Sequence, residues 1–442
     1  MLPKGTRDLL PDDMAKRKYI VSAITSVFEN HAFRQIETPA IELNKTLSGK
    51  YGEEGDRLMF KVLPRGEKLN GLANQPIEFI KSSIEEALRY DLTVPFARMV
   101  VDQRNNINLP FKRYQIQNVW RADRPQKGRF REFTQCDADV VGPAGIIQEA
   151  ELIHIYYKSF KSLKVPVEIR LNHRSLIQGL AELAGAEDKL IAFTIGLDKL
   201  DKVGWNGVEK EWEQAGIPAL DPKVKELLQT KGSLESVLPK LEESLKSMPS
   251  AQRGLAELSQ LNVILSKAPL KETALILDLS LARGLNYYTG CIFEVAALGI
   301  EMGSIGGGGR YDDLTGIFGW KDLSGVGISF GLDRIQLVMD QLNAFPSEIG
   351  LNAQVLFANM DEESSYISFA LAQELRSNGI RCEVYPVQTK MKKQIDFAVK
   401  SNIPFLAILG ENERLNDEIT WRNLETGEQD TLSQKELLNK FK

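Results

Sequence analysis

The stretch that decides the fold is "FKRYQIQNVWRADRPQKGRFREFTQCDADVV", residues 111–141. Its two ends, 111–120 and 130–141, are rich in β-branched and aromatic residues and alternate in polarity, a pattern typical of strands. Between them the polar loop Arg124-Pro-Gln-Lys-Gly interrupts the pattern. We therefore predict a hairpin with a long basic tip.

The hairpin is strongly basic around its tip. Within residues 112–131 there are seven basic residues and one acid, Asp123; the basic residues are Lys112, Arg113, Arg121, Arg124, Lys127, Arg129 and Arg131. Arginine clusters suit phosphate groups, because each guanidinium can hold two oxygens at once. A solvated hairpin surface would carry the same charges, so the cluster alone leaves both interpretations open.

The second strand of the hairpin carries an ordered strip of polar groups. If it is extended, its alternate side chains share one face, and these are Arg131, Phe133, Gln135, Asp137 and Asp139. Gln135 and Asp139 would be about 13 Å apart, at about 3.3 Å per residue. A cation, an aromatic ring, an amide and carboxylates in this order match a ligand with a phosphate, a flat base and a cationic or hydrogen-bond-donating end.

A second acidic segment is "LRYDLTVPFARMV", residues 88–100. Asp91 and Thr93 would lie on one face of an extended segment and offer two acceptors suited to an ammonium group. An Asx or threonine turn ahead of Pro95 is the alternative interpretation.

Two later segments carry further candidates. In "LARGLNYYTGCIFEV", residues 281–295, Arg283 lies in an apolar context, where arginine is rare without an anionic partner. A structural ion pair would also explain it, and Tyr287 and Tyr288 could be ordinary core aromatics. The glycine cluster "SIGGGGRYDDL", residues 304–314, lacks both the GxxxxGK[ST] pattern and the dinucleotide-binding spacing, so it favours close backbone approach to a ligand over a phosphate loop.

Composition narrows the class of protein. A chain of 442 residues is long enough for two or three domains. With 60 acidic and 55 basic residues its net charge is −5, which argues against an indiscriminate nucleic-acid binder but allows a local basic surface. Its three cysteines are far apart and its three histidines are scattered, so we predict no metal site formed by the protein.

The chain has no membrane signal. Lys4 and Arg7 interrupt any signal-peptide core, and no apolar run approaches the ~18 residues that a membrane helix needs. We expect a soluble, cytoplasmic protein.

Hydrophobic periodicity outlines the remaining elements. A helix is expected after Pro11, and residues 174–270 have helical spacing interrupted at Pro218, Pro222, Pro239 and Pro249. Strands are expected at 274–281 and 290–297, then a strand and helix around "GVGISFGLDRIQLVM". After a boundary in 343–354 we predict strands at 355–358, 380–385 and 405–409, with helices at 364–378, stopped by Gly379, and 391–401.

Five segments together resemble the histidyl-tRNA synthetase family, which belongs to the class II aminoacyl-tRNA synthetases. They are "KGTRDLLP", "LRYDLTVPFAR", "VWRADRPQKGRFREFTQCDADVVG", "RGLNYYTG" and "GISFGLDRI". The resemblance covers essentially the whole chain in order. "FRQIETP", ending at Pro39, is similar to class II motif 1, Arg121 to Phe133 to motif 2, and "GLDR" with Arg334 to motif 3.

The resemblance implies an α+β fold. It would consist of a class II antiparallel-sheet catalytic domain in two parts (1–173 and 271–343), a helical insertion (174–270) and a C-terminal α/β anticodon-binding domain (350–442). The implied partners are ATP with Mg²⁺, L-histidine and histidine tRNA, and the implied assembly is a homodimer with motif 1 at the subunit contact.

The resemblance also implies roles for individual residues. Arg121 would hold the α-phosphate of ATP, Phe133 would stack on adenine, and Arg334 would reach the γ-phosphate. Histidine would be held by Asp91, Thr93 and Gln135 at its ammonium group, by Asp139 and Tyr288 at its imidazole, and by Tyr287 lining the pocket. Arg283 would stabilise charge in the adenylation transition state. Two residues depart from the family pattern: Asn286, where many members have Asp, and Asp123, where the class motif has Glu on the adenine side.

Two alternatives from the same fold remain at this stage. The synthetase-like regulatory subunit of ATP phosphoribosyltransferase shares the catalytic fold, but it typically lacks the C-terminal domain and parts of the site. A class II synthetase for threonine, proline or glycine would lack the "RGLNYYTG" type of segment.

Overall fold

The computed structural model describes residues 1–442 except 127, 272–273, 283–286, 348, 351–352 and 442. The chain divides into two compact units, Met1–Phe345 and Pro346–Lys442. The division falls inside the 343–354 stretch in which the sequence predicts a boundary. No helix in the described part is both long and apolar enough to cross a membrane.

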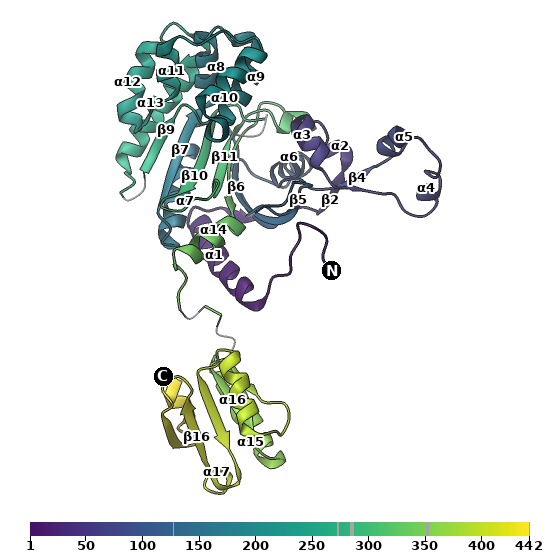
Figure 1. Cartoon of the computed structure of the whole chain (residues 1–442), viewed down its shortest axis with the longest axis vertical. Helices are drawn as coiled ribbons and strands as arrows, with labels where there is room; N and C mark the ends of the chain where they lie inside the picture. The colour runs from purple at the N-terminus through teal and green to yellow at the C-terminus, as the bar shows by residue number, and fades with distance from the viewer. Residues whose placement is uncertain (127, 272–273, 283–286, 348, 351–352, 442) are drawn as a thin grey trace. The chain divides into compact units, whose positions relative to one another are not determined.

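Within the described residues, the first unit is built on a nine-stranded sheet (Figure 1). In spatial order its strands are β1 (Arg34–Gln35), β5 (Phe111–Trp120), β6 (Glu132–Gly142), β12 (Ser324–Gly331), β11 (Gly306–Tyr311), β10 (Cys291–Ala297), β7 (Val167–His173), β9 (Ala274–Asp278) and β8 (Lys231–Gly232). The run from β5 to β7 is antiparallel throughout, whereas β1 and β9 join it in parallel. The predicted α+β fold is confirmed.

The predicted hairpin is formed by β5 and β6. Their register runs from Phe111 opposite Val141 to Trp120 opposite Glu132. The second strand therefore begins at Glu132, two residues later than predicted, and residues 121–131 form the loop between the strands.

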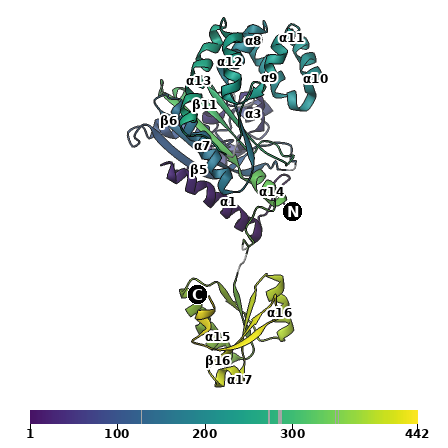
Figure 2. The ribbon, with the colours of Figure 1, turned by 90° about the vertical axis from the view of Figure 1, so that its left-hand side faces the viewer.

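One face of this sheet is covered by helices. The helices α1 (Pro11–Asn30), α7 (Ile147–Ser162) and α14 (Leu332–Gln341) pack together beside β6 and β12 (Figure 2). Phe28 of α1 lies 5.4 Å from the ring of Tyr114 and 5.8 Å from that of Phe330, so aromatic packing fixes the helix on the sheet. Proline at the first helical position, followed by two acids, favours the start of α1 where the sequence predicts it.

The opposite face carries a smaller layer. Its elements are a three-stranded sheet, in the order β2 (Ile41–Leu43), β4 (Glu86–Leu88) and β3 (Lys61–Val62), with α2 (Asn44–Leu47), α3 (Gly52–Leu58) and α6 (Thr93–Asp102). Tyr51, Tyr90 and Val94 from this layer form a buried cluster with Tyr311 of the main sheet. The smaller layer therefore covers the polar face of β6.

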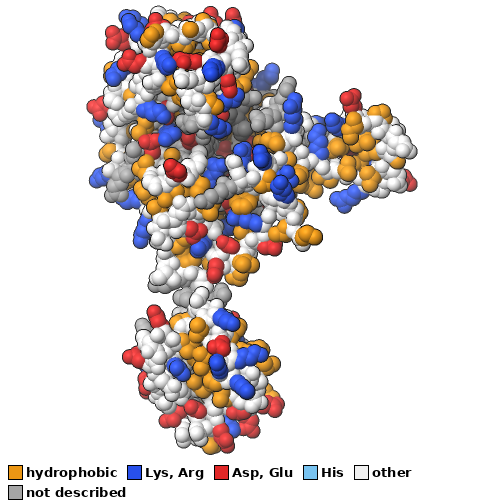
Figure 3. Space-filling model, in the orientation of Figure 1, with side chains coloured by type: hydrophobic (Ala, Val, Ile, Leu, Met, Phe, Trp, Pro, Cys, Tyr) orange, Lys and Arg blue, Asp and Glu red, His pale blue; other side chains and the backbone are white. Residues whose placement is uncertain are grey.

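An arm projects from this layer between β3 and β4. It carries α4 (Glu67–Asn70) and α5 (Ile77–Ser82) and extends from the body of the unit (Figure 1). Leu63, Leu69, Ile77 and Phe79 are exposed on it, and Figure 3 shows the resulting group of apolar side chains.

Residues 174–270 are mainly helical, as predicted. The helices are α8 (Arg174–Leu183), α9 (Leu190–Asp198), α10 (Leu200–Gln214), α11 (Pro222–Leu228), α12 (Leu234–Leu245) and α13 (Gln252–Lys267). The predicted interruption at Pro239 is wrong, because Pro239 lies inside α12. Leu238 and Leu241 on either side of it are buried, so apolar packing outweighs the lost backbone hydrogen bond.

Within the described residues, the second unit contains a five-stranded sheet. Its order is β14 (Cys382–Val384), β13 (Val355–Asn359), β15 (Phe405–Leu409), β16 (Glu418–Asn423) and β17 (Gln429–Ser433), and its helices are α15 (Glu362–Ser377), α16 (Met391–Lys400) and α17 (Glu411–Leu415). Gly379, at φ +80°, follows α15 and confirms the predicted stop. The sequence analysis missed α17, β16 and β17, and β17 is an edge strand whose largely exposed side chains give no alternating signal.

Candidate functional site

The polar strip on β6 forms as the alternation predicts. Phe133, Gln135, Asp137 and Asp139 share the face turned toward the smaller layer, whereas the intervening Cys136 is buried in the core beneath. The strip differs from the prediction at its start. Arg131 precedes the strand, and its Nε donates to the carbonyl of Asp123 at 3.2 Å.

Glycines on the neighbouring strands make room for the strip. Asp139 lies opposite Gly327 of β12, which lies opposite Gly309 of β11. A Cβ added at Gly327 would be 1.9 Å from Asp139 Oδ1, and one at Gly309 would be 2.8 Å from the Tyr288 ring. The glycine cluster forms strand β11 of the sheet. The side chains of Asp139 and Tyr288 occupy the space that a side chain at Gly327 or Gly309 would need, so glycine is required at both positions.

Asp139 is almost wholly buried between two partners. The hydroxyl of Tyr311 donates to its Oδ1 at 2.6 Å, and Arg113 Nη2 lies 2.6 Å from its Oδ2. Burial raises the pKa of Asp139, while Arg113 and the tyrosine hydrogen bond act in the opposite direction.

Asp91 is held at the start of α6. Its Oδ1 accepts from the Tyr51 hydroxyl at 2.7 Å and from the Val94 backbone N–H at 3.2 Å, and its Oδ2 accepts from the Tyr287 hydroxyl at 3.2 Å. Burial raises its pKa. The predicted extended geometry is wrong, because Thr93 is the first residue of the helix. The Asp91 side chain instead makes a local hydrogen bond to the backbone of the first turn, through the N–H of Val94, which is the kind of contact that the alternative interpretation invoked.

Tyr287 and Tyr288 connect these two acids. Their rings meet edge to face at 5.1 Å, and both pack against the buried cluster of the smaller layer. Burial and the surrounding carboxylates raise the pKa of both phenols: Asp91 is the main carboxylate acting on Tyr287, and Asp139 on Tyr288. Both tyrosines therefore keep their protons at neutral pH and can donate hydrogen bonds.

The cationic end of the strip is built around Arg121. Its Cζ lies 4.3 Å from the ring centre of Tyr90 and 5.2 Å from that of Phe133, and its Nε donates to the Tyr90 carbonyl at 3.0 Å. Contact with two aromatic rings holds the guanidinium in place. Asp123 is buried beside it and accepts from Arg129 Nε at 3.1 Å.

Arg334 joins this end from the first turn of α14. Its Nη1 donates to the carbonyl of Ser304 at 2.6 Å and its Nε to that of Gly128 at 3.3 Å. The structure thus places Arg121 against Phe133 and Asp139 near Tyr288, at opposite ends of one strip, while Arg334 contacts Gly128 of the hairpin loop.

Comparison with known families agrees with this geometry. The family model described as Histidyl-tRNA synthetase matches residues 5–335, and the model described as Anticodon binding domain matches residues 354–442. The chain belongs to the histidyl-tRNA synthetase family.

Individual relatives extend this match over nearly the whole chain. A protein of Christiangramia forsetii named Histidine--tRNA ligase is 49% identical over 98% of this chain and 96% of its own length. A protein of Porphyromonas gingivalis with the same name is 48% identical, with the same coverage. The crystal structure of histidyl-tRNA synthetase from Nostoc sp. PCC 7120 is 29% identical, covers 100% of this chain and 98% of its own, and has a TM-score of 0.83. The alternative of a regulatory subunit is not favoured.

Two residues of the basic stretch lie away from the cationic end of the site in this synthetase. Arg113 is fully buried beside Asp139, at the acidic end. Lys112 points to the other face of β5, where its Nζ lies 2.6 Å from Glu151. They therefore take no part in the cationic end, because neighbouring residues of a strand face opposite sides and β5 places each beside a carboxylate.

The sequence analysis did not predict which residues contact the carboxylates of the synthetase site; these are Tyr51, Arg113, Tyr311 and Ser329. The sequence does contain a pattern that points to Arg113, because Arg113, Gln115 and Gln117 make one face of a predicted strand polar. No local pattern points to Tyr51, because it donates its hydrogen bond to Asp91 from 40 positions earlier in the chain.

Some of the predicted synthetase residues cannot be placed. Arg283 and Asn286 lie outside the described residues, as does Lys127 of the hairpin loop. Their expected roles remain predictions from the family resemblance.

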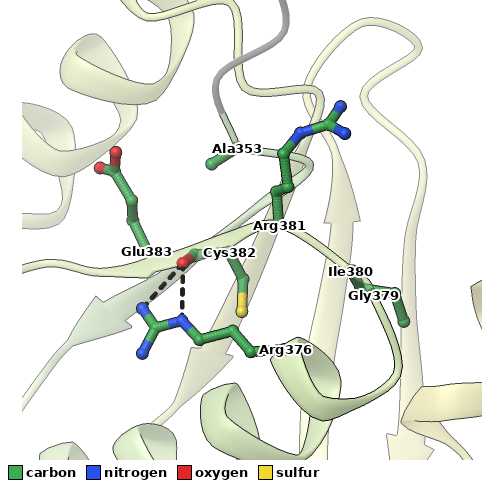
Figure 4. Close-up of a pocket in the computed structure, with 7 residues that line it drawn as sticks. All are labelled: Ala353, Arg376, Gly379, Ile380, Arg381, Cys382 and Glu383. Carbon is green, nitrogen blue, oxygen red and sulfur yellow. Dashed lines mark hydrogen bonds between the residues drawn. The ribbon is translucent and has the colours of Figure 1, made fainter. Parts of the chain in front are cut away.

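A hollow of about 410 Å³ lies in the second unit, lined by Ala353, Arg376, Gly379, Ile380, Arg381, Cys382 and Glu383 (Figure 4). Arg376 does not present a free cation there, because its Nε and Nη2 both donate to the Cys382 carbonyl, at 3.2 and 2.8 Å. That carbonyl belongs to edge strand β14, so Arg376 blocks an exposed strand edge. The residues that line the hollow include one carboxylate, Glu383, and no tyrosine, whereas the β6 site combines several of each.

Proposed function

We propose that this chain joins L-histidine to histidine tRNA in two steps, using ATP and forming a histidyl-adenylate intermediate. The observation that carries the proposal is the single face of β6, with Arg121 beside Phe133 at one end and Asp139 beside Tyr288 at the other. A ligand pair made of an anionic nucleotide and a cationic amino acid matches this order.

At the acidic end, Asp139 and Tyr288 are proposed to bind the imidazole. The amino acid would be selected by hydrogen bonds, because an analogue without the imidazole N–H groups would leave buried polar atoms unpaired. Asp91, Thr93 and Gln135 are assigned to the ammonium group, with Tyr287 lining the pocket. The hydrogen bond between Tyr287 and Asp91 supports placing these groups in one site.

At the cationic end, Arg121 is proposed to hold the α-phosphate and Arg334 the γ-phosphate. Phe133 would stack on adenine, with Asp123 on the adenine side. Mg²⁺ is proposed as the counter-ion of the ATP phosphates, where it would neutralise their charge. The described residues contain no group of three or more His, Cys, Asp or Glu side chains that could hold a metal, so the phosphates would supply most of its ligands.

The first step needs charge stabilisation more than proton transfer. An oxygen of the histidine carboxylate attacks the α-phosphorus, the bond from this phosphorus to the bridging oxygen breaks, and pyrophosphate leaves. The attacking oxygen carries no proton, so no general base is needed. Fixed guanidinium groups can stabilise the charge that builds up on the phosphoryl oxygens, and Arg121 is proposed for this role together with Arg283.

The division of labour along the chain is also part of the proposal. Residues 1–173 and 271–343 would form the catalytic domain, 174–270 a helical insertion, and 350–442 the anticodon-binding domain, with Lys390, Lys392 and Lys393 as a local basic patch for RNA. We further propose a homodimer with its contact near motif 1, at residues 33–39, and a cytoplasmic location.

Histidine-dependent exchange of pyrophosphate into ATP tests the proposal, with each of the twenty amino acids compared under the same conditions. The expected result is exchange with histidine alone, followed by charging of histidine tRNA. Exchange with another amino acid, or histidine binding without exchange, would overturn it.

A further inference from the structure

Arg253 of α13 extends from the helical insertion to the end of strand β11. Its Nη2 lies 3.0 Å from Asp312 Oδ2, and its Nε lies 2.7 Å from Glu257 Oε1, one turn further along α13. Asp312 follows β11 directly, so the arginine ties an element of residues 174–270 to a strand of the main sheet. The planar guanidinium is suited to holding a carboxylate on each side.

His173 fixes the other side of this contact. It is fully buried at the end of β7, and its Nε2 lies 2.9 Å from Glu257 Oε2. Its Nδ1 accepts from the Ser175 backbone N–H at 3.1 Å. Because Nδ1 is an acceptor, Nε2 carries the proton and donates to Glu257. The sheet therefore holds the Glu257 carboxylate, which in turn orients Arg253 toward Asp312.

Asp312 is also joined to the chain just before β10. Its Oδ2 accepts from the Thr289 hydroxyl at 2.8 Å, and its backbone N–H donates to the same hydroxyl oxygen at 3.0 Å. The backbone N–H of Thr289 donates to the Arg310 carbonyl at 2.7 Å. Oδ1 of Asp312 accepts from the Ser324 hydroxyl at 2.6 Å. These bonds fasten the backbone at residues 289 and 312 together.

The residue directly before each member of this pair is a tyrosine of the β6 site. Tyr288, proposed for the imidazole, precedes Thr289. Tyr311 precedes Asp312 and donates to Asp139 Oδ1 at 2.6 Å. Consecutive residues share a planar peptide unit, so restraining Thr289 and Asp312 also restrains the tyrosines beside them.

The exposure of the contact argues against a role in stability alone. The Arg253 side chain is 50% exposed and that of Asp312 22% exposed. Water screens ion pairs of this kind, and they contribute little to folding. Leu258 and Leu261 on the buried face of α13 already hold the helix in the core. The main effect of the contact is therefore on the geometry of the segment that it supports.

We propose that Arg253 is a positioning residue for histidine binding. Through Asp312 and Thr289, the helical insertion supports the backbone that presents Tyr288 and Tyr311 to the amino acid, while Arg253 itself makes no contact with the substrate. The inference rests on the proposed function and extends it, because it gives residues 174–270 a part in amino-acid binding.

Steady-state pyrophosphate exchange on the full-length chain measures the KM for histidine and the KM for ATP. Arg253→Met should raise the KM for histidine roughly 3- to 10-fold and leave the KM for ATP within about twofold, because only the tyrosines lose a support. Arg253→Lys should give an intermediate KM for histidine, since lysine keeps the charge but loses the fork that holds both carboxylates. Lys225→Met is the matched control: it removes an ion pair with Glu209 elsewhere in the insertion and should change neither constant.

A double-mutant cycle tests the path from Arg253 to the tyrosines. Thr289→Val removes the hydroxyl at nearly constant volume and should also raise the KM for histidine. In that background Arg253→Met should add less than about twofold, because the two residues act through the same bonds. Full additivity of the two changes would overturn the inference. If Thr289→Val does not fold, Asp312→Asn takes its place in the cycle.

Thermal unfolding separates positioning from a structural role. The unfolding temperature of Arg253→Met should fall by less than about 3 °C, because the ion pair is exposed. A loss of folded protein would lower the rate without changing either KM. An equal rise in both KM values, or no rise in either, would overturn the inference, and this comparison decides even if neither background variant folds. Failure of the wild-type chain in histidine-dependent exchange would instead reject the proposed function.

Discussion

Arg113 Nη2 lies 2.6 Å from Asp139 Oδ2, and both side chains are almost completely removed from solvent. Arg113 comes from β5 and Asp139 from the opposite position of β6. At the acidic end of the site, the charge of the Asp139 carboxylate is therefore neutralised by Arg113. The Cζ atom of Arg113 also lies 4.5 Å from the centre of the Phe96 ring, so the arginine is packed against an aromatic ring as well as paired with a carboxylate.

Arg113→Met should destabilise the chain by about 3–5 kcal/mol, because it leaves Asp139 buried without its counter-ion. Urea unfolding measures the change. Lys112→Met is the matched control on the same strand: its ion pair with Glu151 is about one-quarter exposed, so the expected loss is below about 1 kcal/mol. Equal losses for both variants would contradict the importance of burial.

Tyr51→Phe should weaken histidine binding, since Asp91 loses a buried hydroxyl donor and with it part of its orientation. Hydrogen bonds to charged groups are worth about 1.5–3 kcal/mol, so the affinity for histidine should fall by at most roughly 10- to 100-fold. Tyr90→Phe is the control, because the Tyr90 ring packs against Tyr51 with their ring centres 4.6 Å apart and the substitution keeps the ring. Calorimetric titration with histidine compares the two variants, and similar affinities would count against a role for the Tyr51 hydroxyl.

Arg121→Lys should raise the KM for ATP roughly tenfold or more and leave histidine affinity nearly unchanged. Lysine keeps the charge but loses the planar fork and its contacts with the Tyr90 and Phe133 rings. Arg124→Lys, on the exposed hairpin loop, should have little effect. Steady-state pyrophosphate exchange measures both constants, and an unchanged KM for ATP would remove Arg121 from the phosphate site.

Stability in acid should depend on Glu257 of α13. Burial would raise its pKa, but hydrogen bonds from His173 and Arg253 outweigh burial and lower the pKa from 4.5 to about 2. This stabilisation is present above about pH 4.5 and is lost as the pH falls toward 2. Glu257→Gln should therefore cost roughly 1–2 kcal/mol at neutral pH and progressively less below pH 4.5, since the carboxylate is partly exposed and screened. Urea unfolding at several pH values tests this, with Glu243→Gln as the exposed control; a cost that does not change with pH would contradict it.

A chain ending at Phe345 should retain histidine-dependent pyrophosphate exchange and lose most charging of histidine tRNA. Every described residue assigned to ATP or histidine lies in the unit that ends there, and removal of a separate RNA contact should lower tRNA affinity without altering adenylation. The truncated chain must first show cooperative unfolding. Charging as efficient as that of the full-length chain would exclude an anticodon role for residues 350–442.

Much of this site could be predicted from local pattern. The alternation in residues 130–141 places Phe133, Gln135, Asp137 and Asp139 on one face, and the structure bears this out. Local pattern failed at Asp91 and Thr93, where the same two residues fit either an extended segment or the start of a helix. It also failed at Pro239, where burial of neighbouring leucines overrides the preference of proline for helix ends.

The sequence by itself determined the hairpin, the order of chemical groups along β6 and, through its motifs, membership of the synthetase family. Only the tertiary structure decided which charges meet. Arg113 and Arg121 belong to the same basic stretch, yet the β5–β6 register places Arg113 beside Asp139 and leaves Arg121 between two aromatic rings. A strand's period of two residues is a local property that can be read along the chain. The partners of each side chain depend instead on pairing between distant strands and on a second layer that brings Tyr51 to Asp91, and no local pattern encodes those contacts.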